Sequence, residues 1–209
     1  MLTIKLIRRY FFSGSLCLAF GFCALSNAAA APVEETAVFA GGCFWGVDAV
    51  FKHVKGVTDV VSGYSGGATA TAHYETVSEG TTGHAEAVRV HFNPAQVSYQ
   101  QLLQVFFGVA HDPTQLNRQG PDTGSQYRSV IFYTSDEQRR IVQDTIRQLT
   151  AAHTFSDPIV TQVVPLQQFY PAEAHHQNYL ALHPYQPYIM FNDMPKLEHL
   201  REQFPALYQ

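Results

Sequence analysis

The chain has 209 residues and a formal net charge of −4, with 46% hydrophobic and 14% charged residues. This length and composition are typical of a globular protein with one full hydrophobic core. The acidic balance and the lack of basic runs argue against nucleic acid or an anionic membrane surface as partners.

The first 30 residues have the pattern of a secretory signal peptide. Three cationic residues precede an apolar stretch from Ser13 to Leu25, and an alanine-rich stretch follows. The apolar stretch is too short to span a membrane. We therefore expect cleavage after Ala30, and an exported protein that is periplasmic or secreted and free of the membrane. Residues 31–35 would form a short linker and residues 36–209 one domain.

Removal of this segment changes the counts of cysteine and charge. Cys17 and Cys23 would leave with the signal peptide, so that Cys43 becomes the single cysteine. Three of the 13 Lys and Arg residues would also leave, and the remainder would carry a formal charge of −7. A lone thiol allows no internal disulfide, and in an oxidising compartment it is either buried and inert or kept for chemistry.

Cys43 lies where a predicted strand turns into a predicted helix. Thr36–Ala40 alternates as a strand does, and apolar residues recur at helical spacing from Phe44 to Val54 before Gly56 ends the pattern. Free backbone N–H groups and the positive end of the helix dipole would favour a thiolate at this point. The pattern therefore indicates a nucleophile. The alternative is a small buried hydrophobe, the usual environment of a free cysteine.

A carboxyl group falls among core positions on a later strand. Over residues 84–92, Glu86 shares one face with Val88, Val90 and Phe92. If it is buried there, desolvation would raise its pKa and could keep it protonated near neutral pH. A carboxylate that reaches water at the strand end is the alternative.

The other predicted elements alternate strands with helices. Capping boxes, Ser98 with Gln101 and Ser135 with Gln138, each open a helix. The sequence predicts strands over 57–62, 73–77, 127–133 and 159–164, helices over 98–109 and from 135 to about 149, and loops over 63–67 and 111–126. The resulting class is α+β, with a mixed sheet, packed helices and an irregular C-terminal wrap from about Gln167.

Histidines gather in that C-terminal part. His175, His176 and His183 lie near Glu173, but their spacing matches no common zinc pattern. We expect these side chains to brace loops at the rim of the site by hydrogen bonds, and we expect no metal.

Several separate motifs together resemble peptide methionine sulfoxide reductase A. They follow the order of that family over nearly the whole chain after the signal peptide: Gly41–Gly46, Gly83–Val88, His111–Thr114, Arg118–Gly120 with Asp122, Gln126–Ser129, and Ala172–Glu173 with His176–Gln177. The resemblance implies a two-layer, ferredoxin-like sandwich. It also implies reduction of methionine-S-sulfoxide, free or in proteins, to methionine.

The resemblance assigns a role to each matching residue. Cys43 matches the nucleophile that attacks the sulfoxide sulfur, and Glu86 matches the acid that protonates the sulfoxide oxygen. Phe44 and Trp45 match the aromatic wall for the methyl group. The two phenols that bind the same oxygen correspond to Tyr74 and Tyr127, and Asp122 corresponds to a loop residue that holds substrate or water.

The chain departs from many family members because no cysteine follows Cys43. It therefore resembles the single-cysteine form, in which an external thiol reduces the sulfenic acid. We expect no bound cofactor, a thioredoxin-, glutaredoxin- or glutathione-type reductant, and a monomer.

Two other classes of protein remain open. A cysteine hydrolase or acyl transferase would activate Cys43 with a histidine such as His84 or His176. An exported binding protein would use the Phe44 and Trp45 pocket for an apolar ligand, and its Cys43 would be inert.

Overall fold

A computed structural model of the chain describes residues 34–209. The predicted signal peptide and most of the predicted linker lie outside the described residues. Glu35, which the sequence assigns to the linker, is the first residue of a strand. No helix in the described part of the chain has the length and apolarity needed to cross a membrane.

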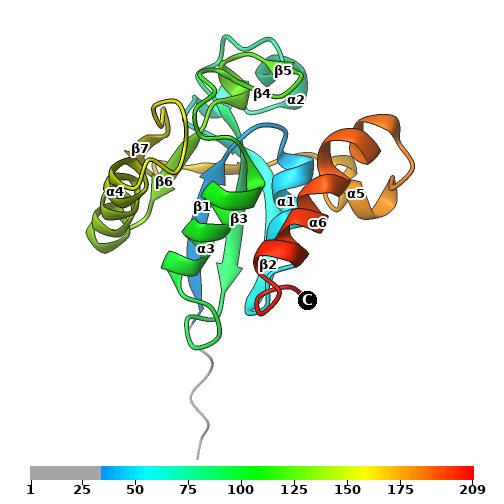
Figure 1. The fold of residues 1–209 in the computed structure, drawn as a ribbon. Helices are drawn as coiled ribbons and strands as arrows, with labels where there is room; N and C mark the ends of the chain where they lie inside the picture. The colour runs from blue at the N-terminus through cyan, green and yellow to red at the C-terminus, as the bar shows by residue number, and fades with distance from the viewer. Residues whose placement is uncertain (1–33) are drawn as a thin grey trace, which may run out of the picture. The chain divides into compact units, whose positions relative to one another are not determined.

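The centre of the described domain, residues 34–209, is a mixed six-stranded sheet (Figure 1). All neighbouring strands are antiparallel except β6 and β7, which are parallel. The order across the sheet is β7 (Gln162–Pro165), β6 (Val130–Tyr133), β1 (Glu35–Ala40), β3 (Ala85–Phe92), β2 (Val57–Ser65) and β8 (Phe169–Pro171).

The helices connect these strands and cover the main core. They are α1 (Phe44–Lys52), α2 (Tyr74–Val77), α3 (Tyr99–Val105), α4 (Asp136–Ala151), α5 (Tyr179–Leu182) and α6 (Met194–Gln203). The chain runs β1–α1–β2–β3–α3–β6, and these strands lie in the order β6-β1-β3-β2. This is the ferredoxin-like arrangement that the family resemblance implied, extended by one strand at each edge.

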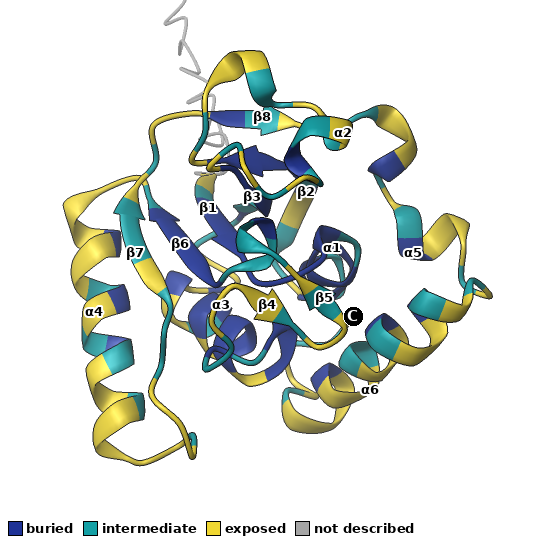
Figure 2. Ribbon diagram, turned by 90° about the horizontal axis from the view of Figure 1, so that it is seen from above, coloured by how far each residue is buried: buried dark blue, intermediate teal, exposed yellow. Residues whose placement is uncertain are grey.

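The two faces of the sheet are buried differently. The larger core cluster holds one side of β1 and β3 against α1 and α3, with Phe39 stacked between Phe51 and Phe106. A smaller cluster on the alternate residues contains Ala85, Ala87 and neighbours from β1, β6 and β8. Figure 2 shows α1 as a largely buried helix in the middle of this domain.

The predicted loop over 63–67 is wrong in its first three residues, which continue β2. Gly63 pairs with Pro171 of β8. A Cβ atom at position 63 would lie 2.3 Å from the Tyr170 carbonyl oxygen, so the glycine permits the close approach of the edge strand. It marks a close strand contact, not a turn.

The predicted strand over 73–77 is also wrong, because this segment forms α2. The Thr76 hydroxyl donates to the His73 carbonyl oxygen, and the Ser78 hydroxyl donates to that of Tyr74. The backbone N–H groups of Val77 and Ser78 donate to the carbonyl oxygens of His73 and Tyr74 at 2.9 Å, so the segment forms a helical turn in place of a strand.

Several predicted boundaries also move. The strand over 127–133 begins only at Val130, after the 3₁₀ turn η3 (Ser125–Tyr127), and the strand over 159–164 shifts to 162–165. The last turn of the predicted helix 98–109 is the π-helix η2 (Phe106–Ala110). The Ser98 capping box forms in full, whereas Gln138 bonds the backbone N–H of Thr134 in place of that of Ser135.

The C-terminal part contains more regular structure than the sequence indicated. Beside β8 and α5 it forms η4 (Ala174–His176), the π-helix η5 (Ile189–Asp193) and the ten-residue α6. Only Leu200 of α6 is buried, and Pro195 stands in its first turn. A helix with so narrow a buried face gives little apolar periodicity, which explains why it was missed.

Candidate active site

Cys43 is the N-cap residue of α1 and is 8% exposed. The two glycines before it allow neighbouring side chains to close on the backbone. A Cβ atom at Gly41 would lie 2.7 Å from the His111 ring, and one at Gly42, whose φ is 92°, would lie 2.6 Å from Gln119. These contacts fix the turn that presents the thiol.

The expectation of a lowered thiol pKa is wrong for this closed site. Burial raises the pKa of Cys43, and the negative charges of Glu86 and Asp193 raise it further. A hydrogen bond with the backbone N–H of Trp45 and the charge of Lys196 lower the pKa by less. Desolvation therefore outweighs the helix N-terminus, and the resting group is a thiol.

Glu86 lies beside the same turn. Its Oε2 accepts a hydrogen bond from the backbone N–H of Phe44 at 3.0 Å, and the residue is 2% exposed. Burial raises the pKa of Glu86 from 4.5 to about 8, although the Phe44 bond opposes this shift. The carboxyl is thus buried on the face of Val88 and Val90, as the strand pattern predicted, and is protonated at neutral pH.

Tyr74 and Tyr127 approach this carboxyl from two other elements, α2 and η3. Burial, and then the negative charge of Glu86, raises the pKa of both phenols. Both rings also pack against the main core cluster. The site therefore holds two neutral O–H donors near the carboxyl and the thiol.

The aromatic pair after Cys43 has two different environments. Phe44 is fully buried, whereas Trp45 is half-buried and stacks on Tyr179 with ring centroids 3.7 Å apart. The Trp45 indole N–H donates to Nδ1 of His176 at 3.2 Å. His176 is thus one of the bracing histidines that the sequence predicted.

Asp122 lies on β5 (Asp122–Thr123), which pairs with β4 (Arg118–Gln119) inside the long loop. Its carboxylate accepts a hydrogen bond from the Tyr188 hydroxyl. Burial raises the pKa of Asp122, while this bond and the Lys196 charge lower it. The bond joins the long loop to the C-terminal segment.

A cavity of about 160 Å³ opens beside the thiol. Sequence reasoning missed its C-terminal wall, because Tyr188, Asn192 and Lys196 lie in a segment without clear periodicity. The lining residues are Cys43, Gln119, Gly120, Pro121, Asp122, Tyr188, Asn192 and Lys196. The wrap therefore reaches the site and forms one side of it.

Of the two histidines that a cysteine hydrolase could use, His84 is engaged elsewhere through both ring nitrogens. Nδ1 of His84 accepts from the backbone N–H of Gly67, and Nε2 lies 3.0 Å from the Ala68 carbonyl oxygen. Nδ1 of His176 accepts from Trp45, whereas its Nε2 is buried without a hydrogen-bond partner. Among the described residues, no group of three or more potential ligands is placed to hold a metal ion.

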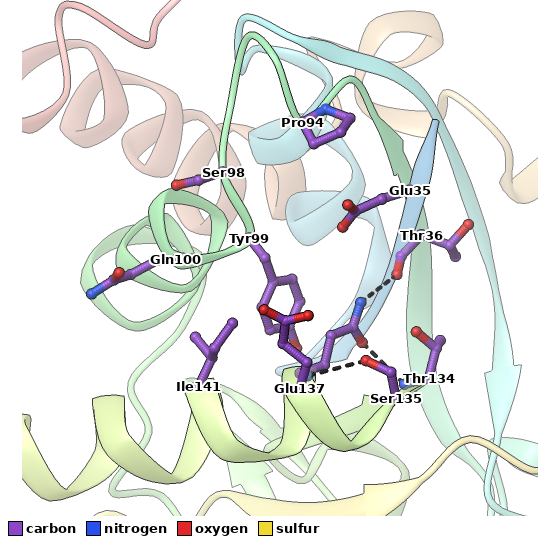
Figure 3. A pocket seen from close by; sticks show the side chains of 11 residues that line it. Glu35, Thr36, Pro94, Ser98, Tyr99, Gln100, Thr134, Ser135, Glu137 and Ile141 are labelled. Carbon is purple, nitrogen blue, oxygen red and sulfur yellow. Dashed lines mark hydrogen bonds between the residues drawn. The ribbon is translucent and has the colours of Figure 1, made fainter. Parts of the chain in front are cut away.

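A second hollow, of about 480 Å³, lies away from the thiol between α3, α4 and the start of β1 (Figure 3). Gln138 is one of the lining residues, and its side-chain amide donates to the Thr36 carbonyl oxygen at 2.8 Å. The eleven lining residues include no cysteine or histidine. The hollow therefore holds neither a thiol nor an imidazole that could activate its hydroxyl groups.

Comparisons with known proteins agree with this geometry. A family model described as peptide methionine sulfoxide reductase matches residues 35–207. The peptide methionine sulfoxide reductase MsrA 2 of Mesorhizobium japonicum is 58% identical over 179 residues, or 86% of this chain and 92% of that protein. MsrA of Thermus thermophilus is 50% identical over 174 residues, or 83% of this chain and 97% of that protein.

Two solved structures share the fold. Mxr1 from Saccharomyces cerevisiae in reduced form matches with a TM-score of 0.69 at 32% identity, over 73% of this chain and 87% of that one. Methionine sulfoxide reductase A of Corynebacterium diphtheriae matches with a TM-score of 0.65 at 36% identity, over 75% and 78% of the two chains. The chain belongs to the peptide methionine sulfoxide reductase family.

Proposed function

We propose that this protein reduces methionine-S-sulfoxide, free or within proteins, to methionine and so repairs oxidised methionine. Membership of the family supports the reaction. The observation that carries the mechanism is the hydrogen bond from the Phe44 N–H to Glu86, which holds a protonated carboxyl at the turn that presents Cys43. A buried acid next to a thiol suits oxygen transfer from sulfur to sulfur.

In the proposed reaction, Cys43 loses its proton and its sulfur attacks the sulfoxide sulfur. This attack forms a sulfur–sulfur bond, while Glu86 protonates the sulfoxide oxygen, which leaves the substrate sulfur as hydroxide. The hydroxide then attacks the Cys43 sulfur, the sulfur–sulfur bond breaks, methionine leaves, and Cys43 remains as sulfenic acid. The proton lost by the thiol restores the acid form of Glu86. The substrate sulfur gains two electrons, and Cys43 is oxidised by the same two.

The other site residues bind the substrate in this proposal. Tyr74 and Tyr127 donate hydrogen bonds to the sulfoxide oxygen, which gains negative charge as the bond breaks. Phe44 and Trp45 enclose the methyl group, and Asp122 holds the substrate or the water involved in recycling. The neutral state of both phenols, favoured by burial and by Glu86, supports their role as donors.

An external thiol completes the proposed cycle, because no cysteine follows Cys43 in the sequence. One thiol condenses with the sulfenic acid to give a mixed disulfide and water, and a second thiol releases Cys43 and leaves as the disulfide product. The reductant is of thioredoxin, glutaredoxin or glutathione type. We expect the protein to work as a monomer without a bound cofactor.

We further propose that residues 1–30 direct export and are removed, so that the enzyme works in the periplasm or outside the cell. The charged start, apolar core and alanine-rich end of this segment support the proposal. The family model begins only at residue 35, so the segment lies outside the part shared with the family. Residues 36–209 would then be the catalytic domain.

A single-turnover experiment tests the reaction. The protein is isolated after export, its N-terminus is sequenced, and a methyl sulfoxide substrate is added without reductant. We expect one methionine released per chain and one oxygen atom added to Cys43 by mass spectrometry, with neither product from Cys43→Ser. Absence of methionine release would contradict the proposed reductase activity. Hydrolysis of esters or amides would instead indicate a cysteine hydrolase or acyl transferase.

A further inference from the structure

Lys196, which lines the thiol cavity, forms an ion pair with Asp193 behind it. Nζ of Lys196, on α6, is 3.1 Å from Oδ1 of Asp193, the last residue of η5. The Asp193 side chain is 0% exposed and that of Lys196 is 18% exposed. The second carboxylate oxygen of Asp193 is buried without a hydrogen-bond partner. A buried, incompletely paired carboxylate is costly, so this position calls for an explanation beyond packing.

The pair packs directly on the first turn of α1, the turn that begins at Cys43. A Cβ atom at Gly46 would lie 2.1 Å from Oδ1 of Asp193 and 2.7 Å from Nζ of Lys196. Gly46 is three residues after Cys43 and is buried. Only a residue without a side chain allows both charges to come this close to the helix start.

The charge around the thiol is otherwise negative or neutral. Glu86 comes from β3, Asp122 from β5, Tyr74 from α2, Tyr127 from η3 and Tyr188 from the turn before η5. Burial lowers the pKa of the nearby His111 to about 4, which leaves it neutral. Lys196 is thus the one cation among the residues that line the thiol cavity.

We propose that Asp193 and Lys196 are positioning residues that set the acidity of Cys43 by opposite electrostatic effects, and that the C-terminal segment thereby controls the nucleophile. The negative charge of Asp193 disfavours the thiolate and the positive charge of Lys196 favours it. At the start of α1, the effect of each charge on Cys43 therefore partly cancels that of the other. This inference deepens the proposed function, but its test measures the thiol itself and does not depend on sulfoxide reduction.

The two charges act directly on the pKa of Cys43, whereas burial and Asp122 raise the pKa of Glu86, opposed by the Phe44 bond. The charge of Lys196 also lowers the pKa of Asp122. The reaction needs an ionised thiol and a protonated carboxyl at the same time. A charge pair beside the thiol therefore shifts the balance between these two pKa values.

The experiment measures the rate of Cys43 alkylation by iodoacetamide against pH in four proteins: wild type, Asp193→Asn, Lys196→Met and the double variant. Removal of the carboxylate lowers the thiol pKa, and removal of the ammonium raises it, each by on the order of one pH unit. At a pH below both values, the alkylation rates of the single variants then differ by on the order of 100-fold. The double variant lies close to wild type, because it removes one charge of each sign.

The exposed pair Glu198 and Arg201 on the same helix provides matched controls. Glu198→Gln and Arg201→Met make the same changes of charge on the outer face of α6, and they leave the thiol pKa unchanged. Urea unfolding of each variant shows that the compared proteins are folded. Three results would overturn the proposal. The thiol pKa could shift in the same direction in both single variants, it could shift as much in the control variants, or it could stay unshifted in every variant.

Discussion

The backbone N–H of Phe44 donates a hydrogen bond to Oε2 of Glu86 at 3.0 Å, joining residues 42 positions apart in the chain. The bond connects the first turn of α1 to the start of β3, so that the carboxyl and the Cys43 thiol share one turn of backbone. Since the bond favours the ionised carboxyl, the raised pKa of Glu86 shows how strongly burial dominates at this position.

Glu86→Gln should abolish most of the activity and stabilise the fold. The amide oxygen still accepts the Phe44 bond, but it cannot supply a proton, so single-turnover reduction should slow by about 100-fold or more. In wild type, reduction should fall as pH rises through about 8, where Glu86 ionises. The residual activity of the variant should not show this fall at high pH. Methionine release measured against pH tests the difference.

The effect on stability follows from the same pKa shift. The folded pKa of Glu86 is about 8 and the ordinary value is 4.5, so between these values the unfolded chain releases a proton that the folded chain retains. Wild type therefore loses stability as pH rises through this window, by at most about 1.4 kcal/mol per pH unit. In urea unfolding, the free energy of unfolding of Glu86→Gln should therefore increase relative to that of wild type as the pH rises from 4.5 to 8. Equal stability of the two proteins across the window would contradict a buried neutral acid.

Asp48→Asn is the matched control for both measurements. Asp48 is another buried carboxyl, and burial raises its pKa from 3.8 to about 6. It lies on α1 with Lys52 as its partner and does not line the thiol cavity. Its substitution should change the dependence of stability on pH below about 6 and leave methionine release unaffected.

The parts of the site that lie on strongly patterned elements could be predicted from the sequence. The burial of Glu86 followed from alternation on one strand, and the position of Cys43 followed from two glycines before an apolar helix. Tyr74 and Tyr127 were assigned only through resemblance, because each lies on a turn whose local pattern predicted a strand. In both places, backbone hydrogen bonds within the turn fix the local structure, and at α2 a distant residue adds to them because the Tyr74 N–H donates to Glu173.

The C-terminal wall of the site could not be predicted in the same way. Lys196 lies on α6, which buries only Leu200 and so shows little apolar periodicity. Tyr188 lies directly before η5, which buries only Ile189 and Asp193. The direction of the Cys43 pKa shift was also wrong. The helix N-terminus is visible in the sequence, whereas the burial that outweighs it depends on how the wrap and the long loop close over the thiol.

Tyr188→Phe should loosen the contact between the long loop and the C-terminal segment. The phenol donates to the Asp122 carboxylate, and a hydrogen bond to a charged group contributes about 1.5–3 kcal/mol. Amide hydrogen exchange should therefore become faster in β5 and η5, and the KM for sulfoxide should rise. Tyr185→Phe removes a hydroxyl from an 86% exposed ring nearby and should change neither quantity. Unchanged exchange in β5 and η5 would show that the bond does not hold the two segments together.

Tyr179→Ala should expose Trp45 and weaken the aromatic wall. The two rings stack at 3.7 Å with an interplanar angle of 7°, and such a pair contributes about 1 kcal/mol beyond the area it buries. Trp45 is the only tryptophan, so its fluorescence reports this site directly. Emission should shift to longer wavelength and KM should rise, while Tyr185→Ala should leave both as in wild type. A raised KM without a change in emission would show that Tyr179 acts on the substrate and does not hold Trp45.

If residues 1–30 are removed as proposed, Cys43 is the single thiol of the mature protein and should limit it to one turnover until another thiol arrives. Without reductant, methionine release should stop at one equivalent, and Cys43 should react with a sulfenic acid probe such as dimedone. Addition of glutathione or of reduced thioredoxin should restart release, with a mixed disulfide at Cys43 as the intermediate. Release of a second equivalent without added thiol would mean that a second reducing group is present in the exported chain. An uncleaved precursor that retains Cys17 and Cys23 could supply such a group, and N-terminal sequencing of the same sample distinguishes that case.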